Sequence, residues 1–222
     1  MLTRKLEDTY LHQGMRKKLV DVMKEKRISD PSVLSAIGKI PRHLFITDNA
    51  FLKQAYDDVA FPIGSGQTIS QPYTVAFQTQ LLQLKKGEKV LEVGTGSGYQ
   101  ACVLAECGVK VFSIERQKSL YDKTKPFLQQ LGYNINCTYG DGYKGWPVYA
   151  PFDKIIVTCG APFIPQALID QLKPGGRMVI PVGEGNVQMM TLIEKTTGSQ
   201  VLESQHGIFR FVPMLGDREW KR

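Results

Sequence analysis

Apolar and polar positions follow a helical pattern in the first quarter of the chain and a different pattern further on. Residues 3–55 predict helices, first a basic amphipathic one that ends near Lys26 and then one that begins at Asp30-Pro31. Asp is a good N-cap and Pro suits the first helical turn, so the second start is clearly marked. The predicted buried positions are Leu19, Val20 and Met23 in the first helix and Val33, Leu34 and Ile37 in the second.

Residues 59–74 interrupt this pattern with four turn-forming residues, Pro62, Gly64, Gly66 and Pro72. Residues of these types favour turns over helices and strands. We therefore predict a structured loop without a regular element. Loops of such composition often carry function.

From Lys89 onward, short β-branched runs alternate with helical segments. The predicted strands cover 89–94, 109–115, 135–139, 154–158 and 177–182, and the predicted helices cover 97–106, 117–131 and 164–172. This alternation is typical of βαβ units and predicts an α/β fold with a mainly parallel sheet and helices on both faces. Two more strands, 189–194 and 207–212, follow without a helix between them, so we expect an antiparallel edge and a seven-stranded sheet.

The composition fits one soluble globular domain. Hydrophobic residues make up 42% and charged residues 22% of the 222 residues, which is ordinary for such a domain. No apolar run approaches the roughly 20 residues that span a bilayer, so no membrane association is expected. Residues 1–8 carry charges where a secretory signal has an apolar stretch, and we expect a cytoplasmic protein.

The net charge of +7 has two explanations. Much of the basic excess lies early in the chain, at Arg4, Lys5, Arg16, Lys17, Lys18, Lys24, Lys26 and Arg27. The solvated face of an amphipathic helix accounts for these charges without any ligand. A nucleic-acid partner is the less favoured alternative.

Cysteines and histidines give no sign of a metal site. The four cysteines, Cys102, Cys107, Cys137 and Cys159, form no CxxC pair. The three histidines, His12, His43 and His206, stand alone in the sequence. Spacing therefore predicts no metal site, and we expect the cysteines to be reduced thiols in the core.

A glycine-rich turn, residues 94–98, joins an apolar strand to the following helix. In an open α/β sheet, ligands bind beyond the carboxyl ends of the strands, and glycine lets the backbone bend and lets a ligand approach. Gly94, Gly96 and Ser97 are thus candidate cofactor contacts. The third glycine comes one residue too early for a dinucleotide fingerprint and the P-loop Lys-Ser/Thr pair is absent, so NAD and a triphosphate are disfavoured.

Two acidic residues stand at the ends of the next two predicted strands. Glu115 lies about 20 residues beyond the glycine turn, where a carboxylate can bind both ribose hydroxyls; capping a nearby helix is the alternative. Asp141, followed by Gly142, could accept a hydrogen bond from the adenine amino group, and a β-turn role is the alternative. Together the three strand ends suit an adenosine without phosphates and predict S-adenosylmethionine as the cofactor.

The residues after the fourth predicted strand disfavour base methylation. Enzymes that methylate base amino groups commonly carry Asp/Asn-Pro-Pro-aromatic there, whereas residues 158–163 read TCGAPF. The chain also has no Pro-Cys pair, which would offer the cysteine nucleophile of cytosine C5 methylation.

An ordered set of motifs resembles one family. The most specific is FPIGSGQTISQPY at 61–73, and the others are PRHLF at 41–45, GDG at 140–142, PFD at 151–153, QLKPGG at 171–176 and FVP at 211–213. Over nearly its whole length the chain resembles the protein-L-isoaspartate (D-aspartate) O-methyltransferase family, bacterial type. The resemblance implies a Rossmann-like fold with an N-terminal helical cap.

The resemblance also implies methyl transfer from S-adenosylmethionine to the free carboxylate of L-isoaspartyl residues in damaged proteins, with D-aspartyl residues left open. The ester then loses methanol to form a succinimide, whose hydrolysis restores some normal aspartate. An ionised carboxylate needs no strong general base. By position Ser70 is the catalytic serine that orients the acceptor, although it could instead cap the next helix. Thr68, Ile69 and Gln71 would line the cofactor side with it.

On this interpretation the chain is a single domain, 1–222. Its parts would be an N-terminal helical region (1–58), an active-site loop (59–75), a cofactor-binding core (76–182) and C-terminal antiparallel strands with a tail (183–222). We expect a monomer that binds isoaspartyl proteins and neither nucleic acid nor membrane. The alternatives are methylation of another carboxylate, a small molecule or RNA, and a non-catalytic protein that binds the cofactor without turnover.

Overall fold

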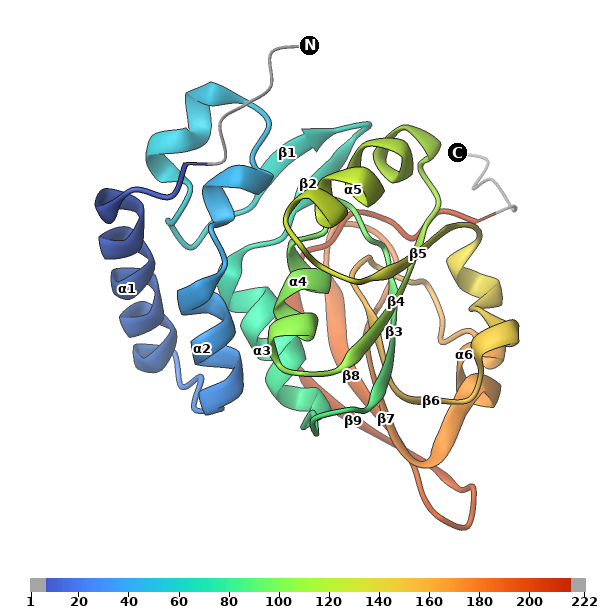
Figure 1. Ribbon diagram of the computed structural model, residues 1–222. Helices are drawn as coiled ribbons and strands as arrows, with labels where there is room; N and C mark the ends of the chain where they lie inside the picture. The colour runs from blue at the N-terminus through green and yellow to red at the C-terminus, as the bar shows by residue number, and fades with distance from the viewer. Residues whose placement is uncertain (1–6, 217–222) are drawn as a thin grey trace.

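A seven-stranded sheet forms the centre of the molecule in the computed structural model, which describes residues 7–216 (Figure 1). In chain order the strands are β3 (Lys89–Val93), β4 (Lys110–Glu115), β5 (Asn136–Tyr139), β6 (Phe152–Val157), β7 (Leu172–Val182), β8 (Gln188–Lys195) and β9 (Val201–Phe209). Their spatial order is β5-β4-β3-β6-β7-β8-β9. The strands from β5 to β7 are parallel, and β8 is antiparallel to both neighbours. The predicted α/β fold with its mainly parallel sheet is confirmed.

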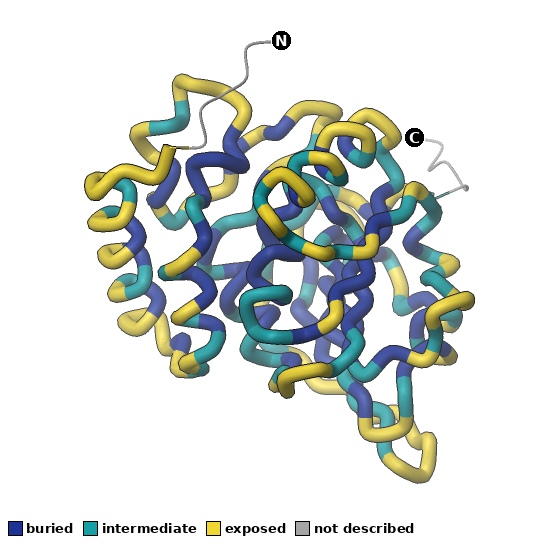
Figure 2. The backbone as a smooth tube through the Cα atoms, viewed as in Figure 1, coloured by how far each residue is buried: buried dark blue, intermediate teal, exposed yellow. Residues whose placement is uncertain are grey.

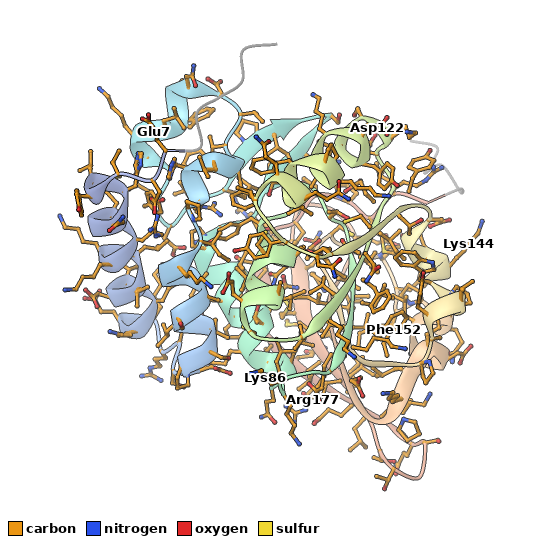
Figure 3. The ribbon with its side chains drawn as sticks, viewed as in Figure 1. Glu7, Lys86, Asp122, Lys144, Phe152 and Arg177 are labelled. Atoms are coloured by element: carbon orange, nitrogen blue, oxygen red, sulfur yellow. The ribbon has the colours of Figure 1, made fainter. Side chains whose placement is uncertain are left out.

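Both faces of this sheet are apolar, and helices cover both. Val90 and Leu91 are neighbours on β3 and are fully buried in different hydrophobic clusters, because successive side chains of a strand point to opposite faces. One face carries α3 (Pro72–Leu82), α4 (Tyr99–Glu106) and α5 (Lys118–Gln130), and the other carries α6 (Gln166–Gln171) with the short 3-10 helices η3 (Gly142–Lys144) and η4 (Pro147–Tyr149). Figure 2 shows the buried centre that results, and in Figure 3 the labelled Phe152 lies in this interior.

A layer of N-terminal helices lies outside α3 and α4 (Figure 1). It consists of α1 (Tyr10–Glu25), α2 (Pro31–Lys39) and two 3-10 helices, η1 (Arg42–Phe45) and η2 (Asn49–Gln54). The Asp30 side chain accepts hydrogen bonds from Ser32 N and Val33 N, so the predicted N-cap of α2 is confirmed. The helical cap is therefore present.

One charge assigned to the exposed face of α1 is buried. Arg16 is 5% exposed, and its guanidinium binds the two carboxylate oxygens of Asp8 at 2.6 and 2.7 Å. The assignment to a solvated face was wrong for this residue, because helical spacing places it on the same side as Leu19 and Met23. Arg4 and Lys5 lie outside the described residues.

Residues 59–74 contain regular structure, so the prediction of an irregular loop was wrong. The strands β1 (Phe61–Gly64) and β2 (Gln67–Ile69) pair antiparallel around a two-residue turn. Ser65 and Gly66 in this turn have φ values of 53° and 67°, and positive φ at both central residues is typical of two-residue hairpins. Buried and exposed side chains alternate along β1, but the prolines and glycines concealed this period in the sequence.

The bounds of two further strands, β7 and β9, also differ from the prediction. The strand β7 begins at Leu172, inside the predicted helix 164–172, and β9 covers Val201–Phe209 instead of 207–212. Side chains of β9 are mostly exposed, so apolar periodicity could not mark its start. After β9 the chain leaves the sheet, and Val212 O and Met214 N form hydrogen bonds with Gly160 beyond the end of β6.

The four cysteines are unpaired thiols, as predicted, and three of them are buried. Burial raises the pKa of Cys107 to about 11 and that of Cys137 to about 12. These thiols are therefore protonated near neutral pH and poorly reactive. Among the helices within residues 7–216, none is long and apolar enough to cross a membrane.

Two histidines that are distant in the sequence meet in the N-terminal layer. The rings of His12 and His43 stack with their centroids 3.7 Å apart, beside the Asp8 carboxylate. The expectation that these histidines stand alone was wrong. Because His43 Nδ1 lies 2.7 Å from the Tyr56 hydroxyl and Asp8 already binds Arg16, we propose no metal site there.

Candidate active site

The glycine turn between β3 and α4 is fastened by the neighbouring strand. Thr158, directly after β6, directs its hydroxyl to Val93 O at 3.0 Å and Gly94 O at 2.7 Å. Gly94 has a φ of +103°, and a Cβ there would come 2.5 Å from Thr158 Oγ1. Contact within the protein therefore requires this glycine, in addition to the ligand approach that the sequence suggested.

Glu115 closes β4 beside the same turn. The residue is 5% exposed, and its two carboxylate oxygens accept hydrogen bonds from Gly96 N and Gln117 N, each at 2.7 Å. Gln117 is the N-cap residue of α5, so the bond from its amide fixes the entry to the helix but does not cap an amide of the first helical turn. Each oxygen retains a further acceptor position, and Glu115 lines a cleft. The carboxylate is thus held in place and can still accept from a ligand.

Asp141 and Gly142 follow β5. Asp141 Oδ1 accepts a hydrogen bond from Tyr143 N at 2.9 Å and caps η3, which is the turn role considered as the alternative. A Cβ on Gly142 would clash with Val93 Cγ1, so this glycine makes room for the side chain from β3. The adenine contact of Asp141 stays a prediction.

The strand ends and the hairpin surround one cleft of about 740 Å³, part of which is open to solvent. The cleft brings together eight of the predicted cofactor contacts, Thr68, Ile69, Ser70, Gly94, Gly96, Ser97, Glu115 and Gly142. The described lining does not include Asp141 or Gln71, and Gln71 lines a second cleft.

The second cleft meets the first at Ser70. Four residues line both, Thr68, Ser70, Thr158 and Val212. From this junction the second cleft runs between the start of α3, at Tyr73, and the segment 206–212. The predicted catalytic serine therefore lies between a space at the glycine turn and a space that opens toward the edge of the sheet.

The helix after Ser70 is capped by a residue from further back in the chain. Asp58 Oδ1 accepts from Tyr73 N at 2.8 Å, and Asp58 Oδ2 accepts from Gln71 Nε2 at 3.0 Å. The helix α3 begins at Pro72 with Gln71 in the N-cap position. The alternative that Ser70 caps this helix was wrong. Pro72 has no N–H, and the first N–H of the helix, that of Tyr73, donates to Asp58.

A buried acid lies beneath the glycine turn. Glu92 on β3 is fully buried, and loss of water raises its pKa to about 8, so it holds a proton at neutral pH. The Ser113 hydroxyl donates to Glu92 and lies 2.6 Å from Thr95 Oγ1 in the turn. Sequence reasoning missed Glu92, although an acid inside an apolar run was a signal.

Other residues of the cleft were missed as well. Thr158, Tyr99, Met214 and Leu215 line it. The strand-end rule that found Glu115 could have found Thr158, because β6 lies next to β3. The segment 212–215 reaches the cleft only because the chain leaves the sheet after β9, and no local pattern announces that path.

A mainly parallel sheet with a glycine turn after a central strand, a fixed carboxylate after the next strand and a cleft between them define a class. The chain is a Rossmann-like S-adenosylmethionine-dependent methyltransferase. The cleft fits this cofactor because Glu115 has acceptor positions to spare for a sugar. The model of the family described as protein-L-isoaspartate(D-aspartate) O-methyltransferase matches residues 14–219, and the chain belongs to this family.

Individual proteins agree with the family match. A protein-L-isoaspartate O-methyltransferase of Christiangramia forsetii is 60% identical over 214 residues, which cover 96% of this chain and 100% of that protein. A solved structure with the same enzyme name is 31% identical with a TM-score of 0.82, over 91% of this chain and 66% of that one. A Plasmodium falciparum protein in complex with S-adenosyl-L-homocysteine is 26% identical with a TM-score of 0.75, over 90% of this chain and 98% of that one.

Proposed function

We propose that this chain transfers a methyl group from S-adenosylmethionine to the free carboxylate of L-isoaspartyl residues in damaged proteins, which leads to succinimide formation. The observation that carries the proposal is the junction of the two clefts at Ser70. A methyltransferase needs a space for the methyl donor and a space for the acceptor that meet at one point. The first cleft, with the glycine turn and Glu115, is the donor space here, and the second cleft is the acceptor space.

Each half of the junction has its own residues. Glu115, Gly94, Gly96, Ser97 and Gly142 would hold the nucleoside and the amino acid part of the cofactor, together with Thr68, Ile69, Ser70, Gln71 and Asp141. The cofactor supplies an activated methyl group on a sulfonium. The Ser70 hydroxyl would donate to one oxygen of the acceptor carboxylate, so that the other oxygen faces the donor space.

Orientation is the main task that the protein performs. A carboxylate with a pKa near 4 is already ionised at neutral pH, so its activation requires no strong general base. Alignment of two reactants can supply several kcal/mol by itself. The hairpin β1-β2 contributes Thr68 and Ile69 to the cleft wall, where it would also exclude water from the carboxylate.

The acceptor chain would lie in the second cleft. Its walls carry the aromatic rings of Tyr73, Phe77 and Phe209 and the segment 206–212. Phe211, Val212 and Pro213 would lie beside the acceptor, whose backbone could bind in extended form with little regard for sequence.

The test compares three peptides that differ at one residue. Purified enzyme is incubated with methyl-labelled cofactor and a peptide that carries L-isoaspartate, normal L-aspartate or D-aspartate at the same position. We expect label on the isoaspartyl peptide and not on the normal one, and the third peptide decides whether D-aspartyl residues are accepted. Equal labelling of the first two peptides, or none, would contradict the proposal.

The partners and location are part of the same proposal. We expect a cytoplasmic monomer of one domain that binds isoaspartyl proteins and no nucleic acid. The case for RNA rested on the basic N-terminal helix, and three of its charges are engaged by acids, Arg16 by Asp8, Lys24 by Asp21 and Lys26 by Asp58. Methylation of another carboxylate or a small molecule would appear as labelling of extracts that resists competition by the isoaspartyl peptide.

A further inference from the structure

Arg42 is a cation with no exposed surface. It lies in η1, in contact with both ends of the hairpin β1-β2, and is 0% exposed. Its Nη2 forms two hydrogen bonds, both to backbone carbonyls, while Nε and Nη1 have no hydrogen-bond partner within residues 7–216. Burial lowers the pKa of this guanidinium. Stability alone does not require such a group, because an apolar side chain of similar volume often serves as well in an interior.

The two carbonyls that bind Arg42 stand at the two ends of the hairpin. Nη2 donates to Val59 O at 3.1 Å and to Ser70 O at 2.9 Å, and the strands β1 and β2 lie between these residues. One nitrogen therefore joins the start and the end of the hairpin at a single point. The backbone carbonyl of Ser70 is thereby held by a buried donor.

The same guanidinium touches the cofactor half of the site. Its Cζ lies 4.8 Å from the centroid of the Tyr99 ring, which is buried. Tyr99 is the first residue of α4, directly after the glycine turn, and it lines the cofactor cleft. Cation–π contact with a desolvated ring is strong enough to hold the two groups together. Arg42 thus connects Ser70 with the helix that carries the glycine turn.

We propose that Arg42 is a positioning residue, which sets the place of Ser70 relative to the cofactor turn and thereby the place of the acceptor carboxylate. This inference rests on the acceptor-orienting role of Ser70 in the proposed function. Without the guanidinium, Val59 O and Ser70 O lose their common donor and the tie to Tyr99 is lost, so Ser70 moves relative to the donor space. The described lining of neither cleft includes Arg42, so its action on the acceptor would run through Ser70.

Four variants of the full-length enzyme test this role: Arg42→Met, Arg42→Lys, Ser70→Ala and the double variant Arg42→Met/Ser70→Ala. We expect Arg42→Met to lower kcat/KM for the isoaspartyl peptide about 10²-fold, the loss that a displacement of about 1 Å can cause, with a much smaller change of cofactor affinity in calorimetry. Arg42→Lys should recover part of the loss, because an ammonium can still donate to a carbonyl. The double variant should be no slower than Ser70→Ala, because Arg42 acts through Ser70.

Arg16→Met is the matched control. Arg16 is the other buried arginine of the N-terminal layer, but its partners are Asp8, Gly38 and Tyr56, none of which lies in the hairpin. We expect this variant to unfold at a lower temperature and to keep the kcat/KM of the folded fraction. Hydrogen exchange of residues 59–71 should become faster in Arg42→Met and not in Arg16→Met.

The outcomes separate this inference from the proposed function. Losses that add in the double variant, or a loss in Arg42→Met that disappears after correction for the folded fraction, overturn the positioning role. Unchanged hydrogen exchange of residues 59–71 in Arg42→Met overturns it as well, even in an enzyme that proves inactive on isoaspartyl peptide. Inactivity of the unmodified enzyme on that peptide overturns the proposed function alone.

Discussion

The cofactor half and the acceptor half of the site are built in different ways. In the cofactor half, Gly96 N and Gln117 N hold the Glu115 carboxylate, and Thr158 holds the turn, so every partner stands at the end of a strand of one sheet. In the acceptor half, Ser70 is held through Arg42 of the N-terminal layer, and its neighbour Gln71 through Asp58, which follows that layer in the chain.

The positions of Glu115 and Ser70 therefore depend on different parts of the fold. The position of Glu115 follows from the sheet, whose central strands are buried on both faces, so the cofactor half is as rigid as the core. The position of Ser70 follows from a few polar contacts between separate layers. We therefore expect changes in the acceptor half to affect turnover and changes in the cofactor half to affect cofactor binding.

The largest effect is expected from Ser70→Ala. Loss of one hydrogen bond that orients a reacting group typically costs about 10²–10³-fold in kcat. Steady-state kinetics with an isoaspartyl peptide should show this loss, while calorimetry should show cofactor affinity close to that of the unmodified enzyme. The reverse result, weak cofactor binding with normal turnover at saturation, would assign Ser70 to the cofactor half.

Glu115→Ala should have the opposite profile. Hydrogen bonds to a charged group contribute about 1.5–3 kcal/mol, so the cofactor dissociation constant should rise by about 10- to 100-fold. Turnover at saturating cofactor should change little, because in the proposed arrangement Glu115 binds the ribose hydroxyls and contacts neither the transferred methyl group nor the acceptor. A fall in kcat at saturation larger than the loss of affinity would break the division between the halves.

Glu92→Gln tests how the buried acid beneath the glycine turn makes the stability of the cofactor half depend on pH. The pKa of Glu92 is about 8 in the folded protein and 4.5 without burial, so between these values the folded state holds a proton that the unfolded state has lost. The free energy of unfolding therefore falls as pH rises through this window and levels off above it. Glutamine cannot ionise, so the variant should gain about 3–5 kcal/mol of stability relative to the unmodified protein between pH 5 and pH 9.

Chemical denaturation at both pH values measures this difference. Glu25→Gln serves as the control, because Glu25 is exposed on α1. A stability gain that does not change between pH 5 and pH 9 would show that ionisation of Glu92 plays no part in it.

The smallest effect is expected from Lys26→Met. Lys26 pairs with Asp58, but its side chain is 43% exposed, and exposed ion pairs contribute about 0–1 kcal/mol. Asp58 keeps its bonds to Tyr73 N and Gln71 Nε2, so kinetics should change by no more than about twofold. A loss comparable to that of Arg42→Met would mean that the acceptor half depends on surface charge as well as on buried contacts.

The same difference explains how far the sequence could predict the molecule. Glu115 and the glycine turn were predictable because strand order and the strand-end rule place them from local patterns. The seven strands followed from apolar runs, apart from the starts of β7 and β9; the side chains of β9 are mostly exposed. Arg16 was misjudged because a buried ion pair and a solvated charge have the same sequence pattern.

The prediction of the acceptor half relied on family motifs instead. Ser70 was found by its place in a recognised segment, and nothing in the sequence connects it with Arg42, 28 positions away. Asp58 was missed because a helix cap normally lies directly before its helix, whereas here a proline occupies the first turn and the cap comes from further back. Contacts between layers require the folded structure, because they depend on how the layers stack.

The cap on η3 has a consequence for the lifetime of the enzyme itself. Asp141-Gly142 is the one Asp-Gly pair in the sequence, and there is no Asn-Gly pair; Asp-Gly is chemically prone to the same succinimide-forming ageing that the enzyme would repair. Ring closure requires the Asp141 side chain to turn onto the nitrogen of Gly142. Here Tyr143 N holds Oδ1 at 2.9 Å, and Gly142 is packed against Val93. The fold therefore slows damage at the most vulnerable bond of its own chain.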